Sequence, residues 1–160
     1  MFKLYNKNMN TKFTAFKTPV GILKITADGN KITAIGFAAR EGRSAELPVV
    51  LQEAKKQLLE YFDGKRKSFK LPLKFPASAS AFRLKIWKAM CRVPYGKTMT
   101  YGELSAKAGN LKAARAAGGA CNKNPFMIIL PCHRIVGSDG SLTGYAGGLN
   151  VKKYLLNLEK

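Results

Sequence analysis

The chain has 160 residues, of which 46% are hydrophobic and 10% aromatic, and these proportions exclude a disordered or fibrous protein. It carries 28 Lys and Arg against 9 Asp and Glu, a net charge of +19, which favours a polyanionic partner. Its three cysteines, with no CxxC spacing, exclude a disulfide framework and indicate neither a zinc site nor a redox site.

The longest uninterrupted aliphatic run, residues 126–130, is far too short to span a bilayer, and the N-terminus lacks the apolar stretch of a signal peptide. We therefore expect no membrane contact and a cytoplasmic protein, or a nuclear one in a eukaryote. The charge does not locate a binding face, because residues 1–76 carry 15 basic and 6 acidic groups and residues 77–160 carry 13 and 3.

Residues 12–37 are predicted to form strands. Apolar and polar residues alternate in the stretch ILKITADGNKITAIGF, on both sides of Asp28-Gly29. An Asp-Gly pair between two alternating runs is a strong hairpin signal. The N-terminus of the protein is therefore expected to contain an antiparallel sheet.

A helix is predicted next, from about residue 48 to residue 62, because apolar residues recur there at near-helical spacing. Gly64 is expected to cap its C-terminus. The proline-punctuated stretch at 70–79, KLPLKFPASA, predicts a linker. We therefore expect an α/β domain over residues 1–76 and a second domain over residues 77–160.

The second domain is predicted to be mostly helical. Pro94 and Gly96 are expected to stop its first helix. The apolar stripe of that helix consists of Phe82, Ile86 and Met90, with Trp87 beside it.

Two short helices follow. The T-x-x-E sequence at 100–103 has the spacing of a capping box, so a helix is expected to begin at Tyr101 and to end at Gly109. Asn110 is then expected to cap a second helix over residues 111–121. Two short helices joined by a Gly-Asn turn are typical of a helix-turn-helix, although hairpins in ordinary helical cores share this pattern.

The second of these helices consists almost entirely of Ala and Gly, with Arg115 in its middle and Lys112 near its start. Such a helix can pack tightly against a neighbouring helix. It can also lie close against a nucleic-acid groove while Arg115 reaches inward. The basic charge of the chain favours the second interpretation.

The single histidine of the chain, His133, directly follows Cys132 in the stretch LPCHRIVG. A thiol reacts as its thiolate, so a reactive cysteine needs a neighbour that removes its proton. Adjacent side chains of an extended segment point to opposite sides, so we expect a water molecule to bridge the pair. The other interpretation is a buried structural cysteine beside a surface histidine.

A histidine that acts as a base needs a carboxylate to hold its tautomer. The second half of the chain offers Glu103, Asp139 and Glu159. Glu103 is already assigned to the capping box, and the residues alone leave the other two open.

Three segments of the chain resemble the methylated-DNA–protein-cysteine methyltransferases, also called O6-alkylguanine-DNA alkyltransferases. They are PCHRIVG at 131–137, AARAAGGACNKNP at 113–125 and GYAGGLNVKKYLLNLE at 144–159. The resemblance covers essentially the whole chain and is densest over residues 81–159. It implies direct, single-turnover transfer of an alkyl group from O6-alkylguanine, and from O4-alkylthymine, in double-stranded DNA to a cysteine.

The resemblance also implies the fold, of class α/β. A small N-terminal α/β domain with an antiparallel hairpin sheet precedes a mostly helical C-terminal domain. The latter contains a winged-helix-like helix-turn-helix that enters the DNA minor groove, and the damaged base is flipped into a pocket. The protein is expected to act as a monomer and to need no metal and no cofactor.

Roles in the chemistry follow from the same resemblance. Cys132 is the alkyl acceptor, His133 is a base that acts through water, and Glu159 is the carboxylate behind it. Asn124 belongs to the turn before this segment, and Tyr101 lies near the guanine N3 and assists the departing base.

DNA contacts are implied in the same way. Arg115 takes the place of the flipped base in the stack, and the other implied DNA-binding residues are Lys112, Ala114, Gly118 and Arg134.

The implied base pocket is lined by Tyr145, Ala146 and Gly147. Ala146 stands where some relatives carry serine, so backbone N–H groups are expected to replace one side-chain hydrogen bond. The structural zinc site of some relatives is not expected, since no Cys or His precedes Cys91.

Two other functions compete with this one. The first is a binding protein, either a helix-turn-helix regulator or an alkyltransferase-like protein that marks lesions. Alkyltransferase-like proteins lack the acceptor cysteine, which this chain keeps. The second is a Cys-His hydrolase, which needs direct contact between nucleophile and base. The adjacent placement of the two residues disfavours it.

Overall fold

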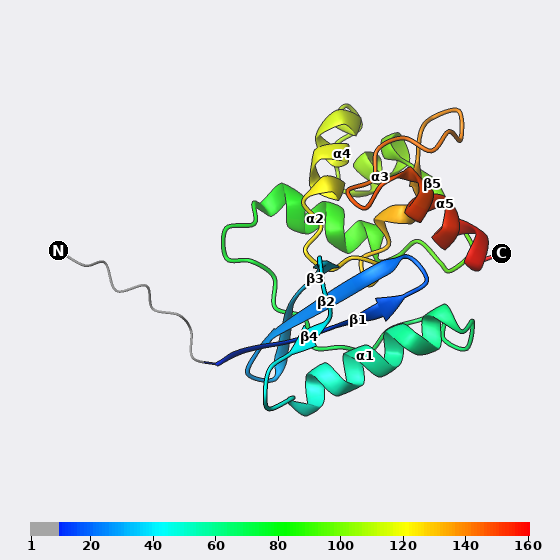
Figure 1. Ribbon diagram of the computed structural model, residues 1–160. Helices are drawn as coiled ribbons and strands as arrows, with labels where there is room; N and C mark the ends of the chain where they lie inside the picture. The colour runs from blue at the N-terminus through cyan, green and yellow to red at the C-terminus, as the bar shows by residue number, and fades with distance from the viewer. Residues whose placement is uncertain (1–9) are drawn as a thin grey trace.

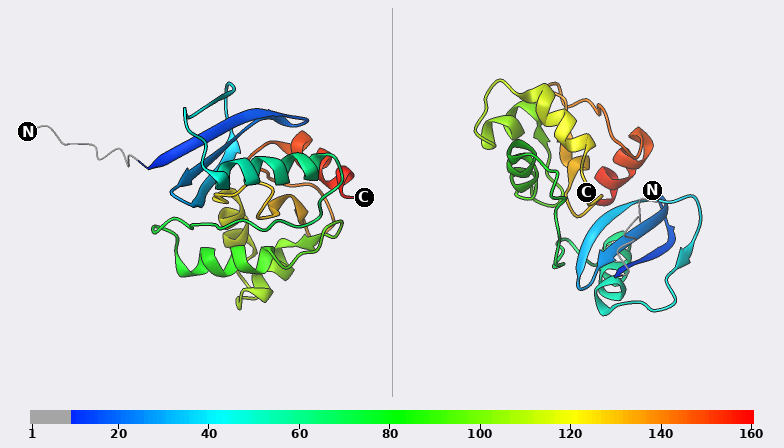
Figure 2. Two further views of the ribbon diagram at one scale, coloured as in Figure 1. Left: turned by 90° about the horizontal axis from the view of Figure 1, so that it is seen from below. Right: turned by 90° about the vertical axis from the view of Figure 1, so that its left-hand side faces the viewer.

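The computed structural model of the chain describes residues 10–160. Residues 1–9 lie outside the described residues. The predicted first domain begins with them, and the expectation that the chain has no signal peptide also concerns them. Figures 1 and 2 show a sheet with one helix beside a mostly helical part. Within residues 10–160, no helix is long and apolar enough to cross a membrane.

The N-terminal part is a four-stranded antiparallel sheet with the strand order β3-β2-β1-β4 (Figure 1). The predicted hairpin is confirmed, because Asp28 pairs with Lys31 and Gly29 adopts the left-handed φ of 60° that the turn needs. The short edge strand β4 was not predicted. The strands are β1 (Thr11–Thr18), β2 (Gly21–Asp28), β3 (Lys31–Phe37) and β4 (Gly42–Arg43).

Helix α1 (Val49–Phe62) packs against this sheet. It begins directly after Pro48, as predicted, and Gly64 follows its end with a φ of 73°. Its apolar side is fully buried, including Leu51 and Leu58, and so is the aromatic residue Tyr61 near its C-terminus.

The segment predicted as a linker is irregular but is fixed to the edge of the sheet. The N–H of Ile32 in β3 donates to the carbonyl of Pro72 at 2.8 Å, and the N–H of Lys74 donates back to Ile32 at 2.8 Å. Further along β3, the N–H of Ile35 donates to the carbonyl of Pro125 at 2.8 Å. Strand β3 therefore joins the two parts, and one hydrophobic core extends through both.

The C-terminal part is mostly helical, as predicted. Its first helix is capped by Ser80, whose hydroxyl accepts a hydrogen bond from the Arg83 N–H. The elements are α2 (Ala81–Met90), β5 (Met99–Thr100), α3 (Tyr101–Lys107), α4 (Ala114–Asn122), the 3₁₀ turn η1 (Cys132–Arg134), β6 (Ile135–Val136) and α5 (Leu149–Leu158).

The capping box of α3 is confirmed. The Thr100 hydroxyl accepts from the Glu103 N–H at 3.2 Å, and the Glu103 carboxylate accepts from the Thr100 N–H at 2.7 Å. Helix α3 ends just before Gly109, which adopts a φ of 90°. Strand β5 pairs in parallel with β6, so the start of α3 lies beside the Cys132–Arg134 turn.

The prediction that Asn110 caps a helix beginning at residue 111 was wrong. The Asn110 side chain instead accepts from the Lys112 N–H at 3.1 Å and closes a turn. The hydroxyl of the buried Ser105 accepts from the Ala113 N–H at 3.1 Å and holds the end of that turn. Helix α4 consequently begins only at Ala114, and Lys112 precedes it.

Candidate active site

The segment that carries the cysteine and the histidine is a 3₁₀ turn and is not extended, so the geometric argument made from an extended chain was wrong. The Cys132 N–H donates to the carbonyl of Leu130 at 2.8 Å, and the Arg134 N–H donates to the carbonyl of Pro131 at 3.0 Å. All three residues of the turn are buried. The interpretation with a surface histidine is therefore also wrong.

Asn124 contacts the sulfur of the candidate acceptor. Its Nδ2 lies 3.2 Å from the Cys132 Sγ and 2.7 Å from the carbonyl of Leu130, while its Oδ1 accepts from the Phe126 N–H at 2.8 Å. Asn124 thus closes the turn before the active segment and donates to the thiol. Burial raises the pKa of Cys132, and the hydrogen bond from Asn124 offsets only part of this effect. The thiol therefore needs a base near neutral pH.

His133 is fully buried and bonds Glu159, with 2.7 Å between Nε2 and Oε1. Burial alone would raise the pKa of Glu159, but hydrogen bonds from His133 and Arg134 outweigh it and hold this pKa far below its ordinary value. Burial lowers the pKa of His133. At neutral pH the carboxylate is therefore ionised and accepts only, so the proton of the neutral imidazole is on Nε2.

The other ring nitrogen, Nδ1 of His133, is buried and has no hydrogen-bond partner among residues 10–160. It carries the free lone pair of the neutral ring and is the position that can accept a proton. Asp139, the alternative carboxylate, is exposed and accepts from the Ser141 N–H at 3.0 Å instead. The structure thus brings His133 together with Glu159 and not with Asp139.

Arg134 does not lie on a DNA-binding surface, so its assignment as a DNA contact was wrong. Only 6% of the residue is exposed. Its guanidinium donates to both carboxylate oxygens of Glu159 at 2.9 Å and to the carbonyl of Val93 at 2.8 Å. Arg134 therefore neutralises the buried carboxylate. Glu159 also accepts from the Tyr61 hydroxyl at 2.7 Å and from the Gly96 N–H at 3.3 Å.

Tyr101 lies at the start of α3 and its hydroxyl donates to the carbonyl of Thr143 at 3.0 Å. Burial raises the pKa of Tyr101 to about 12, so the phenol remains a hydrogen-bond donor at neutral pH. Lys152 of α5, which sequence reasoning missed, is fully buried nearby. Its ammonium donates to the carbonyls of Ile135, Thr143 and Gly144. Tyr101 and Lys152 together hold the loop before α5.

This loop contains the predicted pocket residues. The Tyr145 hydroxyl is buried without a hydrogen-bond partner in the described part of the chain. A Cβ at Gly147 would lie 2.9 Å from the Tyr145 ring and 2.7 Å from the Phe37 ring, so this position accepts only glycine without a shift of those rings. Ala146 is exposed.

Helix α4 has two different faces, one buried and one exposed. One face is buried and consists of Ala117, Ala120 and Cys121. Arg115 and Ala114 are exposed on the helix, as is Lys112 before it. A Cβ at Gly118 would be 3.8 Å from the Tyr101 ring. The small residues therefore allow close packing on one side and leave small exposed side chains around one arginine on the other.

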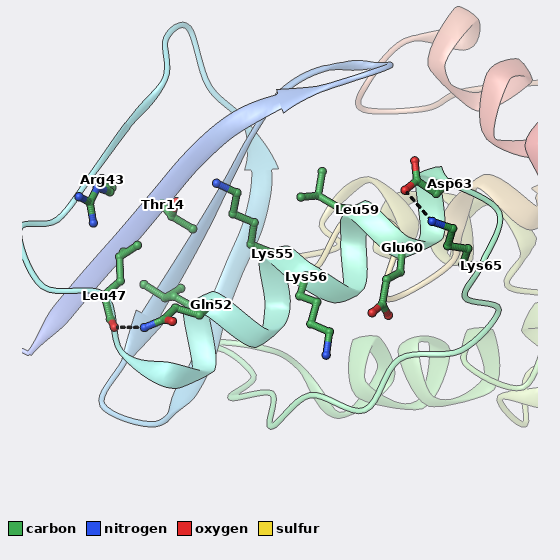
Figure 3. A pocket seen from close by; sticks show the side chains of 11 residues that line it. Thr14, Arg43, Leu47, Gln52, Lys55, Lys56, Leu59, Glu60, Asp63 and Lys65 are labelled. Atoms are coloured by element: carbon green, nitrogen blue, oxygen red, sulfur yellow. Dashed lines mark hydrogen bonds and ion pairs between the residues drawn. The ribbon is translucent and has the colours of Figure 1, made fainter.

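A separate hollow of about 630 Å³ lies between α1 and the strands β1 and β4 (Figure 3). Its lining includes Arg43, Lys55 and Leu59. Figure 1 shows α1 and α4 at opposite ends of the molecule. The lining of this hollow contains none of Cys132, His133 and Glu159, so it is separate from the site around Cys132.

Comparisons with known proteins find relatives of both parts of the chain. A family model described as "6-O-methylguanine DNA methyltransferase, ribonuclease-like domain" matches residues 11–75, and one described as the DNA binding domain of the same methyltransferase matches residues 81–160. The chain belongs to the 6-O-methylguanine DNA methyltransferase family.

Curated members of this methyltransferase family match over nearly the full chain. A methylated-DNA–protein-cysteine methyltransferase of Haemophilus influenzae is 43% identical over 156 residues, covering 92% of this chain and 86% of the relative. The corresponding protein of Methanosarcina barkeri is 39% identical over 155 residues, covering 92% of this chain and 96% of the relative.

Solved methyltransferase structures share the fold. The O6-methylguanine methyltransferase of Mycobacterium tuberculosis superimposes with a TM-score of 0.83 at 35% identity, covering 93% of this chain and 92% of that one. A structure of the M. tuberculosis protein in complex with DNA gives a TM-score of 0.82 at 37% identity, covering 91% and 90%. The α/β fold class expected from the resemblance is confirmed.

Proposed function

We propose that this protein repairs double-stranded DNA by transferring the alkyl group of O6-alkylguanine, and of O4-alkylthymine, to Cys132 in a single turnover. One observation carries the proposal. The buried thiol of Cys132 receives a hydrogen bond from the side chain of Asn124. It lies in the same turn as the neutral His133, whose Nε2 is hydrogen-bonded to the ionised carboxylate of Glu159. This arrangement supplies a nucleophile, a base and a carboxylate that orients the base.

The proton of the thiol leaves through water to Nδ1 of His133. The resulting imidazolium is stabilised by Glu159, which bonds Nε2 at 2.7 Å. The side-chain amide of Asn124, whose Nδ2 lies 3.2 Å from the sulfur, stabilises the thiolate as it forms. Because burial raises the pKa of Cys132, the thiol stays protonated near neutral pH until this base takes its proton.

The thiolate then attacks the alkyl carbon in line with the bond to the guanine oxygen. The S–C bond forms, the C–O6 bond breaks with its electron pair, and guanine leaves as an anion. Guanine takes up one proton from water, and the imidazolium of His133 returns the proton of the thiol to water. Tyr101 donates a hydrogen bond to N3 of the departing base. In the free protein the Tyr101 hydroxyl donates to the carbonyl of Thr143. On binding DNA, this hydroxyl would therefore give up that hydrogen bond and donate to the guanine instead.

DNA is bound through the exposed face of α4. Lys112 contacts phosphate, Ala114 and Gly118 let the backbone approach the minor groove, and Arg115 occupies the stack that the flipped base has left. The pocket is lined by Tyr145, Ala146 and Gly147. The protein acts as a monomer in the cytoplasm, where Cys132 remains a free thiol.

Alkyl mapping tests the proposal directly. Incubation with DNA that carries labelled O6-methylguanine is expected to place one methyl group on Cys132, located by mass spectrometry of peptides. Cys132→Ala should abolish transfer while DNA binding persists, and the matched variants Cys91→Ala and Cys121→Ala should retain it. A label on either of those two cysteines would overturn the assignment. A hydrolase would instead release the alkyl group, and a binding protein would transfer none.

A further inference from the structure

The carboxylate of the proton relay is contacted from the N-terminal part of the molecule. The hydroxyl of Tyr61, in α1, donates to Oε1 of Glu159 at 2.7 Å across 98 positions of sequence. Both side chains are buried, with exposed fractions of 0% for Tyr61 and 3% for Glu159. The family model that covers Tyr61 is the one matched at residues 11–75, which does not contain Cys132.

We infer that Tyr61 is a positioning residue of the His133–Glu159 relay, through which the N-terminal part completes the active site. This inference deepens the proposed function and depends on it. It gives the N-terminal part a role in the chemistry of alkyl transfer, in addition to its share of the common core.

The geometry around Oε1 supports this role. The same oxygen accepts from Nε2 of His133 at 2.7 Å and from a guanidinium nitrogen of Arg134 at 2.9 Å. A third donor, from Tyr61, fixes the direction of the carboxylate and disperses part of the negative charge that otherwise acts on the imidazole. The carboxylate that orients His133 is therefore itself oriented from α1.

The Tyr61 hydroxyl is a constant donor. Burial and the neighbouring charge of Glu159 raise its pKa far above neutral pH, so it stays protonated. Its ring is packed among other aromatic rings, with centroids 5.5 Å from those of Phe62 and Phe69 and 6.2 Å from that of Tyr95. These contacts hold the hydroxyl in place at little further cost in side-chain entropy.

Tyr61→Phe removes this hydroxyl and leaves the ring. The charged groups that face His133 remain, namely Glu159, Arg134 of the same turn and Lys152 of α5. Without the donor, more of the carboxylate charge acts on the imidazole, which favours its protonated form. The pKa of His133 should therefore rise, by about 0.5 to 1 unit. On acidification, the neutral imidazole that accepts the proton should then disappear at a higher pH than in the unaltered protein.

The test is an NMR titration, which needs no assignment because the chain contains one histidine. The imidazole midpoint should move to higher pH in Tyr61→Phe. In the pH–rate profile for alkylation by free O6-benzylguanine, the acid limb should also move to higher pH. The rate on the plateau of that profile should fall about three- to tenfold. An unchanged midpoint and an unchanged limb would overturn the inference, since a merely structural role lowers the melting temperature without moving either.

Tyr95→Phe is the matched control. It removes a hydroxyl from the same aromatic group, but that hydroxyl donates to the carbonyl of Leu158 at 3.2 Å and to no carboxylate. No shift of the imidazole midpoint is expected. An equal shift in both variants would show a general effect of the aromatic packing and would overturn the specific role of Tyr61.

A measurement on the unaltered protein decides the question even if Tyr61→Phe does not fold. The Nε2 proton of His133 should show a nuclear Overhauser effect to the hydroxyl or ring protons of Tyr61, and its absence would overturn the inference. Neither NMR experiment requires alkyl transfer. If the unaltered protein accepted no alkyl group, the proposed function would fail even though the contact and the titration could still be measured.

Discussion

At the scale of single residues, Glu159 connects stability with chemistry. It accepts hydrogen bonds from Tyr61, Gly96, His133 and Arg134. Because its pKa is depressed in the folded protein, its stabilising contribution is complete above the ordinary carboxyl pKa of 4.5 and is lost as the pH falls through the lower folded pKa. Acid should therefore weaken the fold and the relay together.

Glu159→Gln tests this connection. The change leaves the Arg134 guanidinium buried without its charge partner, so the free energy of unfolding should fall by about 3 to 5 kcal/mol. Alkylation by free O6-benzylguanine should be slow near neutral pH and recover partly at higher pH, as thiolate forms without help from the histidine. The measurements are a denaturant titration and a pH–rate profile.

Asp139→Asn is the control for that variant, because Asp139 is exposed and bonds only its own turn. Its pH–rate profile should match that of the unaltered protein. If Glu159→Gln also left the profile unchanged, the histidine would not act as the base.

At the scale of elements, the two faces of α4 fit the proposed mode of DNA binding. Its buried face packs against α2 and α3, where the indole N–H of Trp87 donates to the carbonyl of Ala120 at 2.9 Å. Its other face exposes Arg115 beside small residues. A packed helix with small side chains on its outer face can lie close to a groove and hold one cation at a defined place.

Arg115→Ala should therefore slow repair of O6-methylguanine in duplex DNA while the reaction with free O6-benzylguanine stays unchanged. Extrusion of a base costs a few kcal/mol, and loss of about 1.4 kcal/mol of compensation corresponds to about a tenfold slower reaction. Rates on both substrates, measured with the same protein preparation, provide the comparison. Equal loss on both would show that Arg115 is structural.

At the scale of the whole molecule, the net charge should determine how the protein binds DNA, and the chemistry of the thioether should limit how many alkyl groups each molecule accepts. The net charge of +19 is distributed over both parts, so DNA binding should be largely electrostatic and tolerant of sequence.

Affinity for duplex DNA should consequently fall steeply with salt, because contacts to phosphates release counterions. Titrations at several salt concentrations, with two duplexes of unrelated sequence, should give equally steep slopes. An affinity that does not change over a severalfold range of salt would argue against this mode of binding.

Transfer should stop at one alkyl group per molecule. A thioether formed on Cys132 would be stable, and the three cysteines contain no CxxC pair that could remove it. With methylated DNA in excess, product should rise in proportion to protein and not to time. Sustained turnover beyond one equivalent would make Cys132 an ordinary catalytic nucleophile.

The alkylated protein should also melt at a lower temperature. Cys132 is 7% exposed, and overfilling a packed site costs about 1 to 3 kcal/mol, which corresponds to a decrease of roughly 2 to 12 °C. Cys132→Ala, incubated with the same DNA, should show no such decrease.

The sequence by itself determined the features that depend on near neighbours. The Asp28-Gly29 turn, the capping box at 100–103 and the stripe of α2 each need residues within a few positions of one another, and all three are present. The family resemblance likewise depends on contiguous segments. Local backbone preferences act over one or two turns, so a hairpin turn or a capping box can be predicted without a structure.

Only the tertiary structure decided which groups share the buried site. Tyr61 lies 98 positions from Glu159, and on an amphipathic helix it is indistinguishable from an ordinary core aromatic residue. Nothing in the sequence singled out Lys152, and the resemblance implied a DNA contact for Arg134, yet both are buried. Burial of a charge depends on partners that the fold brings together from distant segments, and no local pattern encodes that pairing.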